Sequence, residues 1–287
     1  LIKNIPNIEL STRPILITYP SSTVSVMSLS LQEYQNLLYG KLTACKGQFD
    51  AYLSENGYKL DFNTELNYVY QIVMSGLNVE YSFPYTPVES VISSFLKAAK
   101  IGLSLCPTEQ LCFLKTEYSE SSGQYVTQLG LGYKGILKLA YRSGKVKQIN
   151  ANVFYEKDTF QYNGVNSKVT HTTTVLSKAM RGQLAGGYCQ TELIDGSFKT
   201  TVMPPEEILA IEEQGKAMGN EAWLSVHVDQ MREKTLIKRH WKTLCPCIYR
   251  DSVMNDPMLF DDQDCQHSSN QQAYEEQFES AYSREAY

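Results

Sequence analysis

The sequence predicts an α+β protein in which small antiparallel sheets or hairpins pack with helices. Runs rich in β-branched and aromatic residues alternate with runs of helical apolar spacing, in the order β-β-α-β and then β-β-α-α. The chain has 287 residues, of which 43% are hydrophobic. That apolar content suffices for a core and excludes wholesale disorder.

The first 86 residues carry few recognisable patterns. PILITY, which begins at Pro14, has the composition of a strand. SLSLQEYQNLLYG predicts a helix that stops at Gly40. We expect residues 1–86 to form a folded N-terminal region that offers contacts between subunits.

The signals sharpen from Pro87. PVESVISSFLKAAKIG has helical apolar spacing and predicts a helix between Pro87 and Gly102. QLCFLKTEY and QYVTQLGL flank SESSG and predict a hairpin. A helix from about Tyr133 to Ser143 follows, and INANVFYE alternates as a third strand should. These elements make up the β-β-α-β part of the predicted core.

A second set of elements completes the predicted core, which spans residues 87–250. YCQTELI and SFKTTVM are separated by Asp195-Gly196, which is a strong signal for a two-residue hairpin loop. PPEEILAIEEQ begins a helix with Pro205 in its first turn. The last predicted helix runs from about Val226 to Leu244.

Charge is distributed unevenly along the chain. The net charge is −5, yet residues 97–185 carry 12 basic and 5 acidic side chains. Residues 251–287 carry 1 basic and 9 acidic side chains, so we expect an acidic, flexible tail there. A basic middle with an acidic tail is typical of a protein that binds nucleic acid.

The stretch GLGYKGILKLAYRSGKVKQI, from Gly130 to Ile149, combines a glycine motif with cations. Its G-x-G-x-x-G spacing is that of dinucleotide-binding loops, and a predicted strand precedes the motif while a helix follows. The surrounding unit is an antiparallel hairpin rather than repeated βαβ, which disfavours a cofactor. The G-x-x-x-x-G-K-[ST] string of ATP-binding P-loops is absent from the sequence.

The helix that follows these glycines carries its cations on one side. At 100° per residue, Lys134, Lys138 and Arg142 fall within an arc of about 80°, opposite Ile136 and Leu139. A second basic run, REKTLIKRHWK, spans Arg232 to Lys242. A row of cations above an apolar face suits a phosphate backbone, since charge neutralisation supplies most of the affinity for DNA.

Several residues are candidates for binding DNA. The rings of His240 and Trp241 could stack on bases, although the core is the favoured place for Trp241. Tyr133 could equally stack on a base or fill the core. The glycines 132 and 135 would let the main chain approach a phosphate, with the helix N-terminus favouring that anion. The predicted DNA-binding residues are Tyr133, Lys134, Lys138, Arg142, Lys145, Lys147, Lys178, Arg181, Lys234, Lys238 and Arg239.

Other chemistries find little support in the sequence. The seven cysteines are scattered and odd in number, as expected for reduced thiols in a cytosolic protein. Cys245, Cys247, Cys265 and His267 offer four soft ligands, but the spacing is not that of structural zinc sites. No run of 18 or more apolar residues occurs, so we expect no transmembrane helix and no membrane partner.

Ordered blocks from about residue 88 to 250 resemble the RecT family of phage single-strand annealing proteins. They include Gly102-Leu103, Gly132-Tyr133-Lys134-Gly135 and Arg142-Ser143-Gly144. The last block matches a family pattern at Met231, Lys234, Thr235, Ile237, Lys238 and Arg239. Residues 1–86 lie outside this resemblance.

The resemblance implies a protein that coats single-stranded DNA and anneals it to a complementary strand during recombination, without ATP and without a required cofactor. It implies a homo-oligomeric ring or helical filament, with the strand backbone in a groove lined by Lys and Arg. It also implies an exonuclease or a host single-strand-binding protein as partner of the C-terminal region. We expect such a protein in the cytoplasm of a bacterial or phage-infected cell.

Two other functions stay open at this point. One is a nucleotide-dependent enzyme that uses the loop from Gly130 to Gly135. The other is a protein that coats DNA without annealing it. The sequence leaves the effect of Mg²⁺ on either activity undecided.

Overall fold

The computed structural model describes residues 15–17, 27–29, 31–75, 83 and 86–249. It confirms the α+β class and divides the described chain into two compact units. One unit holds the first four helices with residues 114–129. The other holds residues 103–113 and the described chain from Gly130 onward. The predicted boundary after residue 86 therefore lies inside the first unit.

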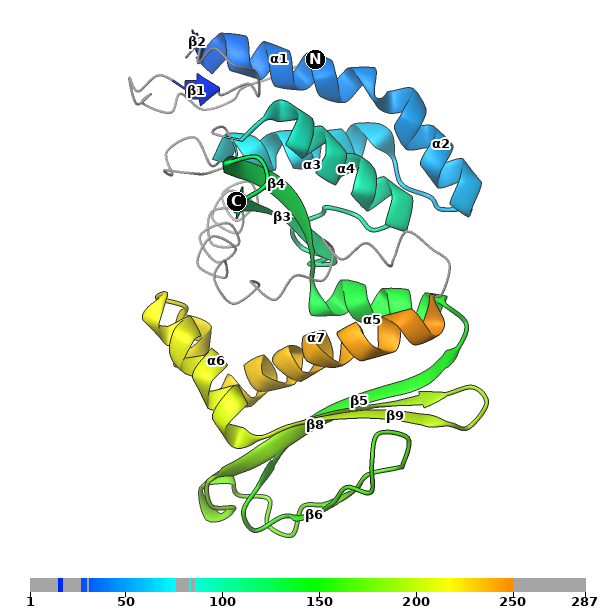
Figure 1. Cartoon of the computed structure of the whole chain (residues 1–287), viewed down its shortest axis with the longest axis vertical. Helices are drawn as coiled ribbons and strands as arrows, with labels where there is room; N and C mark the ends of the chain where they lie inside the picture. Colours follow the sequence, from blue (N-terminus) through cyan, green and yellow to red (C-terminus); the bar gives the residue numbers. More distant parts are fainter. Residues whose placement is uncertain (1–14, 18–26, 30, 76–82, 84–85, 250–287) are drawn as a thin grey trace, which may run out of the picture. The chain divides into compact units, whose positions relative to one another are not determined.

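The first unit is mostly helical (Figure 1). Its aromatic centre stacks Phe49 on Phe95, with ring centroids 4.9 Å apart. Its elements are β1 (Ile15–Ile17), β2 (Met27–Leu29), α1 (Leu31–Ala44), α2 (Lys46–Asn56), α3 (Phe62–Ser75), α4 (Val88–Ile101) and most of the hairpin β3 (Cys112–Ser119) and β4 (Gln124–Leu131). The predicted helix after Pro87 is confirmed as α4, and Gly102 ends it in a left-handed conformation with φ of 63°.

The predicted helix stop at Gly40 is wrong, because α1 continues to Ala44. Glycine costs a helix interior about 1 kcal/mol relative to alanine, which burial of an apolar face can outweigh. Tyr34, Leu38 and Leu42 are fully buried at successive i, i+4 positions across Gly40. Their burial holds the helix together on both sides of the glycine.

The second unit is built on a three-stranded antiparallel sheet in the order β5-β8-β9. Figure 1 shows α7 lying across this sheet, with α5 alongside α7 and α6 at one end. The elements are α5 (Tyr133–Arg142), β5 (Val146–Tyr155), β6 (Thr159–Gln161), β7 (Thr170–Thr172), η3 (Lys178–Met180), β8 (Leu184–Leu193), β9 (Phe198–Met203), α6 (Pro205–Ala217), η4 (Glu221–Trp223) and α7 (Val228–Ile248).

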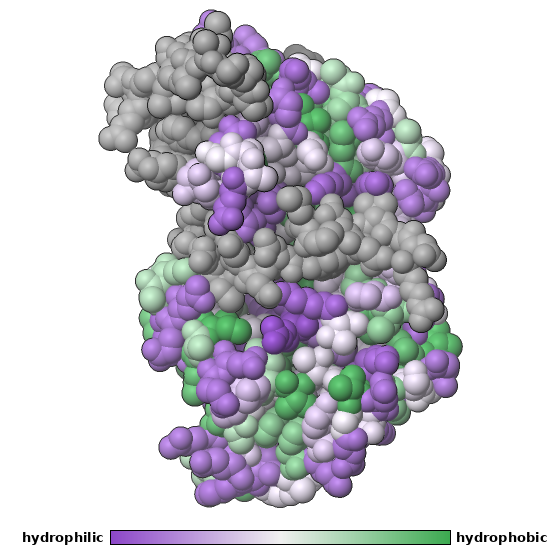
Figure 2. Space-filling view, in the orientation of Figure 1, coloured by the Kyte–Doolittle hydropathy of each residue, from purple (hydrophilic) through white to green (hydrophobic). Residues whose placement is uncertain are grey.

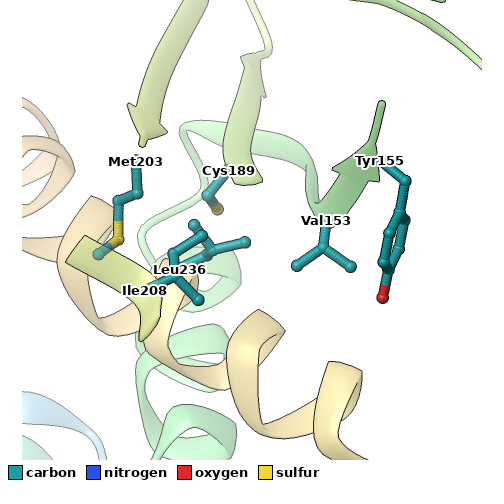
Figure 3. Close-up of a cluster of buried hydrophobic side chains, with 6 residues drawn as sticks. All are labelled: Val153, Tyr155, Cys189, Met203, Ile208 and Leu236. Atoms are coloured by element: carbon teal, nitrogen blue, oxygen red, sulfur yellow. The ribbon is translucent and has the colours of Figure 1, made fainter. Parts of the chain in front are cut away.

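The hydrophobic core of this unit lies between the sheet and two helices. Val153 and Cys189 come from neighbouring strands, while Ile208 and Leu236 come from α6 and α7 (Figure 3). Tyr155 and Met203 complete the cluster. On the face drawn in Figure 2, hydrophilic and hydrophobic residues are interspersed over both units.

Most predicted elements after residue 87 are confirmed, with two differences. The β-β-α-β order is present, but its strands divide between two sheets, because β5 pairs with β8 and the hairpin β3-β4 stands alone. The last helix passes through Pro246 and ends at Ile248 rather than near Leu244. A proline inside a helix removes one backbone hydrogen bond, and the buried Leu244, Cys245 and Ile248 hold this turn in place. Among the described helices, none is long and apolar enough to cross a bilayer.

Candidate nucleic-acid interface

Helix α5 has the two faces that its sequence predicts. Gly135, Ile136, Leu139 and Ala140 are buried. Lys134 and Lys138 on the opposite side are exposed, while Arg142 is half-buried. The ammonium group of Lys138 lies 4.0 Å from the Glu109 carboxylate, and both side chains are about half exposed. A pair of this kind contributes little to stability, so it leaves the lysine available to another anion.

The three glycines of the motif all face the protein's own chain. A Cβ on Gly130 would lie 2.6 Å from the Phe113 ring. On Gly132 it would lie 2.1 Å from the carbonyl oxygen of Gln110, and on Gly135 it would lie 2.0 Å from that of Leu111. The amide of Gly132 also donates a hydrogen bond to the Leu111 carbonyl, at 2.9 Å.

The expectation that Gly132 and Gly135 approach a phosphate is therefore wrong. Carbonyl oxygens carry partial negative charge and already fill the space beside both Cα atoms. They would repel a phosphate there as well as block it. The motif serves close packing between residues 110–113 and the start of α5, which accounts for the glycines without a nucleotide.

Helix α7 brings the second basic run beside α5. The ammonium group of Lys234 lies 5.4 Å from the centroid of the Tyr133 ring. At the other end, the Lys145 ammonium donates to the Ile248 carbonyl at 2.9 Å, and the Tyr249 hydroxyl donates to the Leu139 carbonyl at 2.6 Å. The two helices therefore run in the same direction side by side (Figure 1).

Two basic runs about 100 residues apart in the sequence thus meet in one unit. Lys238, one turn after Lys234, lies with its ammonium group 5.8 Å from the centroid of Phe113. We call this region the α5–α7 basic surface, which comprises Lys134, Lys138, Arg142, Lys234 and Lys238. Phe113 is not among the residues predicted from the sequence, although it is an aromatic residue at the start of β3 and lies against Gly130.

Four other predicted cations, Lys147, Lys178, Arg181 and Arg239, also lie in ion pairs with acidic side chains. Their partners are distant in sequence and were not foreseen. Lys147 pairs with Glu192 of β8, Arg239 with Glu207 of α6, and Lys178 with Asp229 at the start of α7. The Lys178 pair is the shorter of the last two, at 2.8 Å against 3.8 Å for Arg239.

Arg181 lies in the most enclosed of these pairs. Its guanidinium donates to both carboxylate oxygens of Asp158, whose side chain is fully buried. Hydrogen bonding from Arg181 lowers the pKa of Asp158 and outweighs the effect of burial. Arg181 also lies over the Tyr155 ring, at 4.5 Å from its centroid. Arg181 therefore has a structural role, because it pairs with a buried carboxylate.

A second buried network accounts for Arg232, the first residue of the second basic run. Its guanidinium donates to Glu212 at 2.6 Å and to Asp229 at 2.9 Å. Burial raises the pKa of Glu212, but the hydrogen bonds from Lys216 and Arg232 outweigh that effect and leave the pKa lowered. Arg232 therefore ties α6 to α7 and is not exposed to a ligand.

The flat rings of the second run belong to the core. Trp241 is 2% exposed, which decides between its two alternatives in favour of packing. His240 is 1% exposed, and its two ring nitrogens lie 2.8 Å from the hydroxyls of Thr191 and Thr201. Burial lowers the pKa of His240 to about 4, so this histidine is neutral at pH 7. Burial confirms the core alternative for Trp241 and argues against base stacking by His240.

The proposed metal ligands do not gather in the part of the chain that the structure describes. Cys245 is buried and Cys247 is exposed. Two positions along a helix turn the side chain by about 200°, so the two sulfurs face different ways. Cys265, His267 and the acidic segment 251–287 lie outside the described residues. Among the described residues, no three His, Cys, Asp or Glu side chains are placed to hold one ion.

Comparison with known proteins decides the family. A sequence model of the RecT family matches residues 69–270, which include α4, the hairpin and the whole α5–α7 basic surface. The chain belongs to the RecT family. The RecT match begins earlier than the predicted resemblance and takes in the end of α3.

The chain is also similar to Protein RecT of Escherichia coli strain K12. The two are 29% identical over 158 residues, which cover 54% of this chain. The same alignment covers 57% of Protein RecT, so the chain spans a little more than half the length of this curated relative.

Proposed function

We propose that this RecT-family chain binds single-stranded DNA by its backbone and anneals it to a complementary strand without ATP. The observation that carries the proposal is the meeting of two basic helices, α5 and α7, at the α5–α7 basic surface. Membership of the RecT family supports annealing during recombination.

Annealing requires no bond chemistry. Two polyanionic strands repel each other, and a cationic surface removes that repulsion while it extends the first strand. Contacts to phosphates leave the bases free, so sequence discrimination comes from base pairing and not from the protein. Exposed lysines such as Lys134 and Lys138 suit this role, because their long side chains can follow a flexible backbone.

The packing of the glycine motif favours ATP independence over a nucleotide-dependent enzyme. The carbonyl oxygen of Gln110 occupies the space beside Gly132, the glycine that approaches the pyrophosphate in a dinucleotide-binding loop. Saturable binding of ATP or NAD at millimolar concentration would restore the enzyme alternative. Annealing at the same rate with and without ATP would support the proposal.

The protein is further proposed to act as a homo-oligomeric ring or filament. A row of subunits would extend the α5–α7 basic surface along a strand, and avidity would then exceed the affinity of one subunit. Lys145, Lys147, Lys178 and Arg239 are proposed as secondary DNA contacts that would exchange their present partners for phosphates, whereas Arg181 would keep its pair with Asp158. An exonuclease or a single-strand-binding protein is the proposed partner of the C-terminal region.

The test measures binding to an oligo-dT strand at several salt concentrations. Each phosphate contact to a single strand contributes about 0.7 to the slope of log K against log salt. Lys134→Gln with Lys138→Gln should therefore weaken binding and reduce that slope by about 1.4. Lys157→Gln with Lys168→Gln is the matched control, since both lysines are exposed and lie outside the surface.

An unchanged slope in the Lys134/Lys138 variant would refute the assignment of the surface. Annealing is then followed with two complementary fluorescent strands. Acceleration by the wild-type protein supports the proposal. Coating of both strands without acceleration would leave a DNA-coating protein as the function.

A further inference from the structure

Two aromatic rings of the second unit each lie beneath a lysine of α7. The ammonium group of Lys234 is 5.4 Å from the Tyr133 centroid, and that of Lys238 is 5.8 Å from the Phe113 centroid. Both rings and both lysines are half-buried. The lysines are four residues apart, so they project from the same side of α7, about 6 Å apart along its axis.

The glycine motif fixes both rings in place. Phe113 lies against Gly130, where a side chain would strike the ring at 2.6 Å. Tyr133 directly follows Gly132, which is held by its hydrogen bond to the Leu111 carbonyl. The rings therefore come from main chain that is closely packed, whereas a lysine side chain has four rotatable bonds of its own.

We propose that Tyr133 and Phe113 are positioning residues that hold the ammonium groups of Lys234 and Lys238 ready for the DNA backbone. This inference rests on the proposed function and deepens it. A cation is attracted to the face of an aromatic ring. That attraction restricts the lysine before DNA arrives, which reduces the ordering cost of binding.

The same geometry argues against base stacking on these rings. The ring face beneath an ammonium group cannot also receive a base. A ring that positions a cation acts on phosphates only through that cation, and its contribution is then the same for every base. A stacking ring would instead lose its contribution when the strand has no bases.

The test uses Tyr133→Leu, which removes the ring, and Tyr133→Phe, which keeps it. Each is measured alone and together with Lys234→Gln, by fluorescence anisotropy on an oligo-dT strand and on an abasic strand of equal length. Tyr133→Leu should weaken binding about two- to fivefold on both strands, as expected for one cation–π contact. In the Lys234→Gln background, Tyr133→Leu should cause no further loss of affinity. Tyr133→Phe, which keeps the ring, should bind DNA as the wild type does.

The second pair gives an independent readout. Phe113→Leu with Lys238→Gln should show the same lack of additivity, so the inference does not depend on the folding of one variant. Emission from the two tryptophans, which both lie in the second unit, checks that each variant is folded.

Three results would overturn the inference. In the first, Tyr133→Leu weakens binding by the same factor in the Lys234→Gln background as in the wild type. In the second, Tyr133→Leu weakens binding only to the strand that has bases. Both results indicate that the ring stacks on a base. In the third, Lys234→Gln binds DNA as tightly as the wild type, which shows that Lys234 does not contact the strand. The annealing assay tests the proposed function separately from this result. Failure of the wild-type protein to bind either strand would end the proposed function together with the inference.

Discussion

Because Gly135 is closely packed, we predict that Gly135→Ala lowers stability, whereas helix propensity alone would predict a gain. Gly135 lies inside α5, where alanine should stabilise a helix by about 1 kcal/mol. A Cβ at this position would lie 2.0 Å from the Leu111 carbonyl oxygen. Real Cβ contacts are almost never below 3.0 Å, so the main chain must move by at least 1.0 Å.

Two costs oppose the gain in propensity. Overpacking of this kind costs about 3 kcal/mol when the neighbour is main chain. The Leu111 carbonyl also accepts the 2.9 Å hydrogen bond from Gly132, and its displacement costs about 1 kcal/mol more. Gly135→Ala should therefore destabilise the second unit by about 3 kcal/mol after the gain of about 1 kcal/mol is subtracted.

Gly40→Ala is the matched control. Gly40 also lies inside a helix, α1, but a Cβ there would meet nothing within 4 Å. This substitution should stabilise its helix by about 0.5–1 kcal/mol. Amide hydrogen exchange of α1 and α5 measures both effects locally, and tryptophan emission in urea follows the second unit. Stabilisation by Gly135→Ala would refute the packing of the glycine motif.

Three further predictions concern charge and pH. Arg181→Gln should cost about 3 kcal/mol in urea unfolding, because it removes the guanidinium from the buried Asp158 carboxylate, whereas Lys147→Gln at an exposed pair should cost less than about 1 kcal/mol. The pKa of His240 is about 4 in the fold against 6.5 unfolded, so the unfolded state binds more protons between these values. Stability should fall by about 3 kcal/mol from pH 7 to pH 4, and His240→Asn should remove that part of the slope. Removal of residues 251–287, which carry 9 acidic and 1 basic side chains, should leave binding to oligo-dT intact or tighter, since an acidic segment does not attract a polyanion, and loss of binding would contradict this expectation.

Helix ends that depend on neighbouring residues could be predicted from the sequence. Contacts between residues far apart in the sequence could not. Pro87 and Gly102 bracket α4 as predicted, because caps act within one or two residues. Gly40 failed as a stop because the burial of Tyr34, Leu38 and Leu42 outweighs a local preference of about 1 kcal/mol.

The α5–α7 basic surface was predicted in its parts and not in its assembly. The exposed cations of α5 follow from helical spacing alone, which Lys134 and Lys138 confirm. No local pattern shows that Arg181 pairs with the buried Asp158, or that residues 110–113 lie against Gly132. The burial of Trp241 could have been found, since it lies on one helical face with Leu236 and Leu244.

The glycine motif contains residues with two different roles, packing for the glycines and proposed DNA binding for Lys134. In a dinucleotide-binding loop the second glycine lets the main chain approach the pyrophosphate, whereas here the second glycine, Gly132, faces the carbonyl oxygen of Gln110. Between Gly132 and Gly135, Tyr133 is half-buried and Lys134 is exposed. Substitution of a glycine should then act through folding at every salt concentration. Substitution of Lys134 should weaken DNA binding and reduce the slope of log K against log salt. A motif of this spacing therefore identifies a nucleotide site only when the space beside its second glycine is open to the ligand.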